Sequence, residues 1–369
     1  MPLSKIKTNS IADEVFEAGP NLIINGAMQV AVRGTSAVAA AANYPSIDRF
    51  KAWESTDGAY TVEQSTTAPA GFTTSLKAQV TTADTSLAAN QYAQLSQQIE
   101  AQNLQSLVYG TNDAKTVTLS FYVRSNKTGS YSITIYKDDA TSYLFNKSYT
   151  IDSADTWERK SITITPDSNI KASGGAIANN NGIGFYVFWN LAGGTDFDDA
   201  TDNTWSANTS HFHTSSQVNW MDSTSNNFYL TGVQLEIGSL ETPFQHEDYA
   251  TTLRKCQRYF EAIDVTSYFV TGCSYTTAQF NAAPMSFKVE KRANPTITYP
   301  TVGTSSNTIG VTNATANYGG QGSVLRASVT KSAFSIYNNA NDGFSSLTDD
   351  GVCQVYSYGL TTITASAEL

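Results

Sequence analysis

The 369-residue sequence is poor in charge, in cysteine and in long apolar runs. Only 15% of its residues are Asp, Glu, Lys or Arg, against about a quarter in typical soluble domains. The 22 Lys and Arg are outnumbered by 32 Asp and Glu, which gives a formal net charge of −10. Because nucleic-acid binding requires clustered Lys and Arg, we expect no nucleic-acid partner.

The cysteines are Cys256, Cys273 and Cys353, an odd number without CxxC spacing. We therefore expect no disulfide framework, as for a protein completed in a reducing cytosol. The N-terminal segment, MPLSKIKTNSIADEVFEAGP, lacks the apolar core of a signal peptide. No stretch reaches the ~20 apolar residues of a membrane-spanning helix, so membrane insertion is not expected.

Uncharged polar residues and aromatics take the place of the missing charge. Ser, Thr, Asn and Gly occur in nearly every segment, and the chain holds 20 Tyr and 17 Phe. Aromatic and β-branched side chains suit the pleated, half-buried surface of a sheet, so the composition favours strands over helices. The length allows about two or three domains, each with its own core.

Short alternating runs, separated by turn residues, predict many short strands. Residues 117–123 and 131–136 alternate apolar and polar side chains on either side of Lys127-Thr128-Gly129, a pattern typical of a β-hairpin. Further strands are predicted at 157–165, 183–190 and 227–236. Many strands without alternating helices indicate an all-β fold, an antiparallel β-sandwich or jelly roll.

The pattern divides the chain into four parts. Residues 1–20 are polar and resemble a terminal arm that cannot bury a core alone. Residues 21–245 form the predicted sandwich, and residues 263–369 form a second β-rich domain. Between them, a short linker helix is predicted at 246–262 from apolar side chains at helical spacing. These are Tyr249, Leu253, Cys256 and Phe260.

Four segments together resemble a module of tail-fibre and related virion proteins of tailed bacteriophages. They are NLIINGAMQVAVRG (21–34), IDRFKAW (47–53), SFYVRSNKTGSYSI (120–133) and VQLEIGSLETPFQHEDYATTLRKCQRYF (233–260). The module, over residues 21–262, resembles a carbohydrate-binding jelly roll followed by a helix with a CQRYF-type ending. Residues 263–369 resemble the β-rich tails that often follow it.

The resemblance implies a virion structural protein without catalytic residues: a tail fibre, made in the host cytoplasm, that recognises the host. It implies a homotrimer that joins other tail or adaptor proteins through residues 1–20 and contacts host-surface polysaccharide. Two alternatives remain. One is a head decoration, collar or adaptor protein without a ligand. The other is a depolymerising tailspike enzyme, whose usual repeated β-helix period is absent from this sequence.

Two groups of residues are candidate ligand sites. Loop aromatics beside Asn and Asp are suited to stack on sugar rings, although packing in the core or rim is the more common role of any single one; these are Trp205, Phe212, Trp220 and Tyr229. Closely spaced acids supply the oxygen ligands that a structural calcium ion prefers, although a solvated acidic loop explains them as well. These are Asp196, Asp198, Asp199 and Asp202. No other cofactor is expected.

Overall fold

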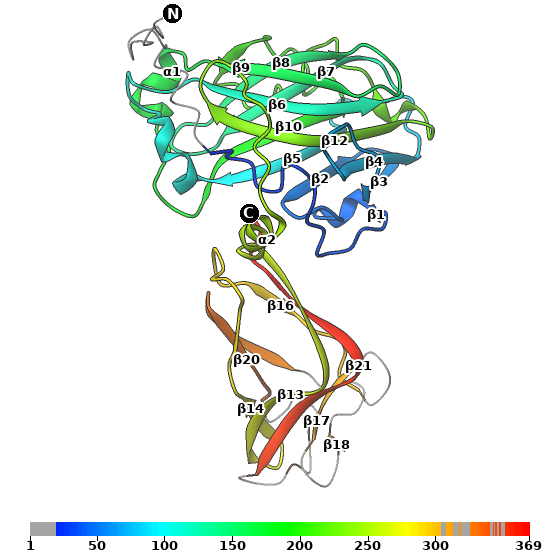
Figure 1. The fold of residues 1–369 in the computed structure, drawn as a ribbon, viewed down its shortest axis with the longest axis vertical. Helices are drawn as coiled ribbons and strands as arrows, with labels where there is room; N and C mark the ends of the chain where they lie inside the picture. The colour runs from blue at the N-terminus through cyan, green and yellow to red at the C-terminus, as the bar shows by residue number, and fades with distance from the viewer. Residues whose placement is uncertain are drawn as a thin grey trace, which may run out of the picture. The chain divides into compact units, whose positions relative to one another are not determined.

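The computed structural model describes residues 20–303, 308–312, 317–318, 325–339 and 351–369, with Asp342, Phe344 and Leu347. The predicted arm therefore lies outside the described residues, except for Pro20. The chain divides into two compact units, with the boundary between Thr252 and Leu253. Both units consist of antiparallel sheets (Figure 1), so the predicted all-β fold, with a sandwich and a second β-rich part, is confirmed.

Two six-stranded antiparallel sheets form the sandwich of the first unit, which is a jelly roll. The first sheet has the strand order β1 (Val38–Ala39), β3 (Ala59–Ser65), β4 (Ser75–Thr82), β12 (Asn227–Ile237), β6 (Val117–Ser125) and β9 (Glu158–Ile164). The second sheet has the order β11 (Thr204–Ser206), β8 (Tyr143–Ile151), β7 (Gly129–Lys137), β10 (Ile183–Gly193), β5 (Tyr92–Glu100) and β2 (Phe50–Ser55).

Short helical turns connect these strands. They are α1 (Ser168–Lys171) and the 3-10 helices η3 (Ala40–Ala42), η4 (Ala101–Leu107), η5 (Ser173–Gly175) and η6 (Trp220–Asp222). No helix in the described part of the chain is long and apolar enough to cross a membrane.

The predicted hairpin between residues 117–123 and 131–136 is wrong. Strand β6 pairs with β9 and β12 in one sheet, whereas β7 pairs with β8 and β10 in the other. The turn therefore carries the chain from one sheet to the other. Alternation does not distinguish the two cases, because both strands point their apolar side chains into the same core.

Large aromatic side chains fill the space between the sheets. Trp189 of β10 is fully buried, with its ring centroid 6.1 Å from that of Phe50 and 5.9 Å from that of Phe121. Phe50 lies in the second sheet and Phe121 in the first, so one indole joins both layers.

A buried carboxylate holds the segment that leaves the sandwich. Glu236 is 0% exposed, and its oxygens accept hydrogen bonds from the Thr242 backbone N–H, the Thr242 hydroxyl and the Gln234 amide. The Gln234 amide oxygen accepts the N–H of Gln245 at 2.8 Å. The Gln-x-Glu of the sequence motif thus fixes the path of the following residues.

The second unit is built on one nine-stranded antiparallel sheet. Its long strands β13 (Phe260–Thr276) and β21 (Val352–Ser366) lie side by side (Figure 1). The shorter strands are β14 (Gln279–Ala282), β15 (Met285–Ser286), β16 (Thr296–Thr298), β17 (Ile309–Thr312), β18 (Asn317–Tyr318), β19 (Arg326–Val329) and β20 (Ala333–Tyr337). Its core includes Phe280, Ile336 and Val355.

The helix α2 (Tyr249–Gln257) is shorter than the predicted 246–262. Phe260 belongs to β13, where it pairs with Ser366 of β21. The last residues of the predicted helix therefore pair in a sheet instead of continuing the helix. Tyr249 is 53% exposed and Leu253 is half-buried, so the predicted stripe is not a continuous buried face.

Candidate functional site

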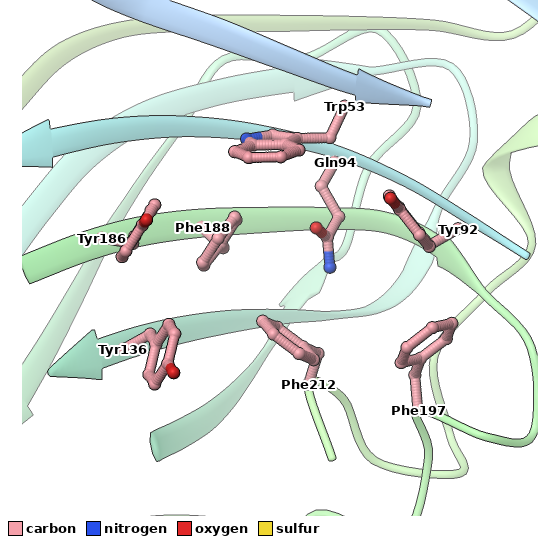
Figure 2. A pocket seen from close by; sticks show the side chains of 8 residues that line it. All are labelled: Trp53, Tyr92, Gln94, Tyr136, Tyr186, Phe188, Phe197 and Phe212. Atoms are coloured by element: carbon pink, nitrogen blue, oxygen red, sulfur yellow. The ribbon is translucent and has the colours of Figure 1, made fainter. Parts of the chain in front are cut away.

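A groove of about 280 Å³ lies on the face of the second sheet that points away from the sandwich core. Strands β2, β5, β7 and β10 supply most of its lining, and the segment between β10 and η6 supplies the rest. The lining residues are Trp53, Tyr92, Gln94, Tyr136, Tyr186, Phe188, Phe197 and Phe212 (Figure 2). Seven of these eight side chains are aromatic.

Strand alternation and register bring the rings together. On β10, Phe185, Val187 and Trp189 point into the core, so Tyr186 and Phe188 between them point outward. Tyr186 pairs with Tyr136 across the β7–β10 ladder, and Trp53 of β2 pairs with Gln94 of β5. Four neighbouring strands thus place these side chains on the same face of the sheet.

The rings form a continuous network. Tyr186 stacks on Tyr136 and on Phe188, each with a centroid distance of 5.5 Å. Figure 2 shows Trp53 on one side of Phe188 and Phe212 on the other, with centroid distances of 6.2 Å and 5.4 Å. Because such ring pairs stabilise one another, the groove has a preformed shape.

Polar contacts fix the Trp53 wall of the groove. The indole N–H donates to the Ser96 hydroxyl at 2.7 Å. The Lys51 ammonium lies 3.6 Å from the indole ring centroid, in a cation–π contact. These two contacts, both from the sheet itself, hold the ring upright beside the groove.

The opposite wall is a loop tied to the sheet. The Phe212 N–H donates to the Phe197 carbonyl at 2.8 Å, and the Phe212 carbonyl accepts from Asn190 Nδ2 at 3.0 Å. The next residue, His213, is 3% exposed, and burial lowers the pKa of its imidazole. A Cβ at Gly193 would lie 2.2 Å from His213 Nε2, so only glycine fits beside this ring.

Few polar atoms face the groove. Gln94 donates from Nε2 to Asn190 Oδ1 at 2.8 Å, and no described residue donates to its Oε1. The hydroxyl groups of Tyr92, Tyr136 and Tyr186 complete the polar lining. Burial raises the pKa of Tyr186 to about 12, so this phenol is neutral and can donate a hydrogen bond at ordinary pH.

Of the four predicted ligand aromatics, the structure places only Phe212 in the groove. The prediction that Trp205 stacks on a sugar is wrong. Its side chain is 4% exposed, packs against Phe145 and donates the indole N–H to the Thr165 carbonyl. Trp220 is wrong as well, since it is fully buried against Tyr60. Both tryptophans close the sandwich core rather than facing solvent.

The prediction that Tyr229 contacts a sugar is also wrong. It is 8% exposed on β12, in the other sheet from the groove, and its ring is covered by the Arg124 guanidinium at 4.9 Å. Its neighbours therefore leave little of its surface for a ligand.

The predicted calcium ligands do not converge. Among the described residues, which include 196–202, no three His, Cys, Asp or Glu side chains are grouped as metal ligands. Asp202 instead accepts hydrogen bonds from Lys147 Nζ at 2.7 Å and from the Ser148 N–H at 2.6 Å. Asp202 therefore forms an ion pair instead of joining the other three acids in a metal site. The segment fits the alternative of a solvated acidic loop.

The sequence contains a pattern that indicates the groove, but it lies in a strand and not in the loops where the candidate aromatics were predicted. In the run IGFYVFWN, aromatic residues occupy both faces of β10, although only one face meets the core. Aromatics on the outer face of a strand, here Tyr186 and Phe188, require a second partner surface. The same alternation applied to β2 identifies Trp53.

Comparison with known proteins gives structural likenesses only. No family model matches the chain, and no curated protein matches it. Among solved structures, it is similar to a putative sugar binding protein from Bacteroides thetaiotaomicron, with a TM-score of 0.32 and 13% identity over 59% of this chain and 99% of that one.

Two other solved structures are similar to the chain. One is the enzymatically active domain of tailspike protein 4 from bacteriophage CBA120, with a TM-score of 0.31 and 11% identity over 59% of this chain and 21% of that one. The other is a family 11 carbohydrate-binding module from Clostridium thermocellum, with a TM-score of 0.28 and 11% identity over 53% of this chain and 91% of that one. Because these TM-scores are low, the similarity carries no conclusion about function.

Proposed function

We propose that the first unit binds a glycan in the aromatic groove and does not cleave it. The observation that carries this proposal is the group of outward-facing rings on four adjacent strands, an apolar surface outside the core of the sandwich. The apolar faces of sugar rings pack on aromatic side chains, and their hydroxyl groups pair with neutral donors and acceptors such as Gln94 and Tyr186.

The absence of cleavage is part of the proposal. Glycosidases generally require two carboxyl groups that flank the scissile bond. The eight lining residues include no Asp or Glu. Incubation of the protein with a bound polysaccharide should therefore release no reducing sugar, and release of reducing sugars would favour the tailspike alternative.

Binding is tested with a matched pair of variants. Trp53 and Trp157 are both half-buried, but only Trp53 lines the groove. On a glycan array and then by calorimetry, Trp53→Ala should weaken binding at least about tenfold, as expected for an aromatic anchor. Trp157→Ala should bind as the wild type does. Equal affinities of all three proteins would place the glycan elsewhere and refute the groove.

We further propose that the chain is a tail-fibre protein of a bacteriophage particle, attached through residues 1–20. Support comes from the resemblance of residues 21–262 to such proteins, whose Gln-x-Glu motif has a defined structural role here. A chain that starts at Asn21 should melt at the same temperature but be missing from purified particles. Incorporation of the shortened chain would overturn the role of the arm.

Support for a homotrimer comes from the outer face of the β13–β21 pair. Four large apolar side chains are exposed there: Tyr268 (63%), Tyr275 (47%), Val352 (68%) and Leu360 (64%). They expose on the order of 100 Å² each, about half of the ~800 Å² per partner in a stable interface. Leu360 protrudes because residues 358–360 bulge opposite the single residue Thr266.

Charge favours a second copy of this face as its partner. The four exposed side chains are uncharged, so two copies can meet over them without burying an unpaired charge, while the exposed Asp264 of β13, beyond Leu360, stays at the edge of the contact. The first unit is a poor partner by comparison, because it carries 25 acidic and 14 basic residues, a net charge of 14 − 25 = −11. We therefore propose that the chains assemble through β13 and β21.

The thiol of Cys273 can be used to test this assembly, because Cys273 is exposed on this face whereas Cys256 and Cys353 are buried. In the native protein, maleimide should label Cys273 slowly, and light scattering should give three times the 39.8 kDa chain mass. Val352→Asp should lower the mass and expose the thiol, whereas Val108→Asp in the first unit should change neither. A monomer with fully reactive Cys273 would refute the assembly.

A further inference from the structure

We propose that the groove selects sugars with apolar substituents, namely 6-deoxyhexoses or O-acetylated residues, over fully hydroxylated hexoses. This inference rests on the glycan-binding function proposed above. It starts from the scarcity of hydrogen-bonding groups among the lining side chains, in a groove whose floor and both walls are aromatic.

The floor shows this scarcity most clearly. Phe188 lies at the centre of the groove, flanked by Trp53 and Phe212, and is only 5% exposed. Gln94, the one amide in the lining, is 6% exposed and uses one of its two N–H groups to bind Asn190. A ligand group that reaches Phe188 therefore meets mostly carbon, and the polar groups within the lining are the Gln94 amide and the tyrosine hydroxyls.

The polar groups behind the floor are already paired. Asn190 Nδ2 donates to the Ser132 carbonyl, the Thr134 hydroxyl and the Phe212 carbonyl, at 3.0, 2.9 and 3.0 Å. The Trp53 indole N–H is bound to Ser96. These side chains stabilise the walls of the groove and have no further donor to offer a ligand.

The consequence for a sugar follows from the cost of desolvation. A hexose hydroxyl that leaves water for this floor loses its hydrogen bonds, which costs about 1–3 kcal/mol when no partner replaces them. A methyl group at C6 or the methyl of an acetyl ester gains from the same burial. The lining also contains no charged side chain, which suits an uncharged substituent.

The orientation of the floor rings determines how a sugar can stack in the groove. The side chains of Tyr186 and Phe188 stand parallel, with 6° between their planes, and Figure 2 shows them side by side between the two walls. Parallel rings present their edges to the groove, so the flat face available to a sugar is that of a wall ring. A sugar stacked on a wall directs its substituents toward the floor.

The experiment is a glycan array of bacterial surface polysaccharides, each printed before and after mild alkaline removal of its O-acetyl esters. The array also carries pairs of methyl glycosides that differ only at C6, such as L-fucoside and L-galactoside. We expect the bound spots to be the acetylated or 6-deoxy members. Their signals should fall at least about fourfold when the substituent is absent, the ratio for burying one methyl group.

Variants connect this preference to the groove. Phe212→Gln places an amide beside the floor and should reduce the ratio between substituted and unsubstituted glycans, whereas Trp157→Ala should leave the ratio unchanged. Binding that ignores the substituent, or prefers the hydroxylated member, would overturn this inference while leaving glycan binding intact. Absence of binding to every spot would instead overturn the proposed function.

Discussion

The buried ion pair between Lys291 and Glu261 gives a strong test of how the second unit is held together. Lys291 Nζ lies 2.6 Å from Glu261 Oε2, with side-chain exposures of 0% and 2%. The ammonium also donates to the Gln257 carbonyl, and the Glu261 carboxylate also accepts the Lys288 N–H. The pair thus joins the end of α2 to the start of β13 and to residues 288–291.

Removing one partner leaves the other as an unpaired buried charge. We expect Lys291→Met to lower the free energy of unfolding of the second unit by about 3–5 kcal/mol, the usual cost of such a change. The double variant Lys291→Met/Glu261→Leu should recover much of this loss, because both charges then disappear together.

The measurement is urea denaturation followed by circular dichroism, with each transition assigned by hydrogen exchange to one of the two units. Lys331→Met is the matched control: the same substitution at an exposed lysine should change the free energy by at most about half a kcal/mol. A loss below about 1 kcal/mol for Lys291→Met, or a double variant no more stable than the single one, would refute the reasoning.

Two further predictions concern the first unit. Burial lowers the pKa of the folded His213 imidazole, so below pH 6.5 the unfolded chain binds a proton at this residue more readily than the folded chain does. The stability of the first unit and its glycan binding should therefore fall on acidification, and His213→Gln should flatten both pH profiles. Glu236→Ala leaves the Thr242 N–H and hydroxyl without their acceptor and should cost about 3 kcal/mol. Glu236→Gln, which keeps one acceptor oxygen, should cost less, and equal melting temperatures for the two would contradict the role of the carboxylate.

Strand positions were predictable from the sequence, whereas strand partners were not. The runs at 117–123 and 131–136 lie within β6 and β7, because alternation reports which side chains are buried. It does not report whether consecutive strands pair or face each other across a core. The assumption of a hairpin failed here for that reason.

The candidate site was harder to predict, because burial is set by tertiary packing. Trp205 and Trp220 lie in or next to polar segments, which suggested exposure, yet both are enclosed by rings from strands distant in the sequence. Phe212 comes from the same region and does reach the groove. Nothing local distinguishes the three, whereas the excess of aromatics on β10 pointed to a second apolar surface.

Variants of the groove residues differ in how well they separate an effect on glycan binding from an effect on stability. Phe188 touches Trp53, Tyr186 and Phe212 and is nearly buried, so its truncation would collapse the network and alter stability as well as binding. Trp53 is anchored from behind by Ser96 and Lys51, which remain in place when the indole is removed. Its loss takes away one wall and leaves the floor. A comparison of affinity with stability is therefore informative at Trp53 and ambiguous at Phe188, so a variant of the wall residue gives the clearer test of binding.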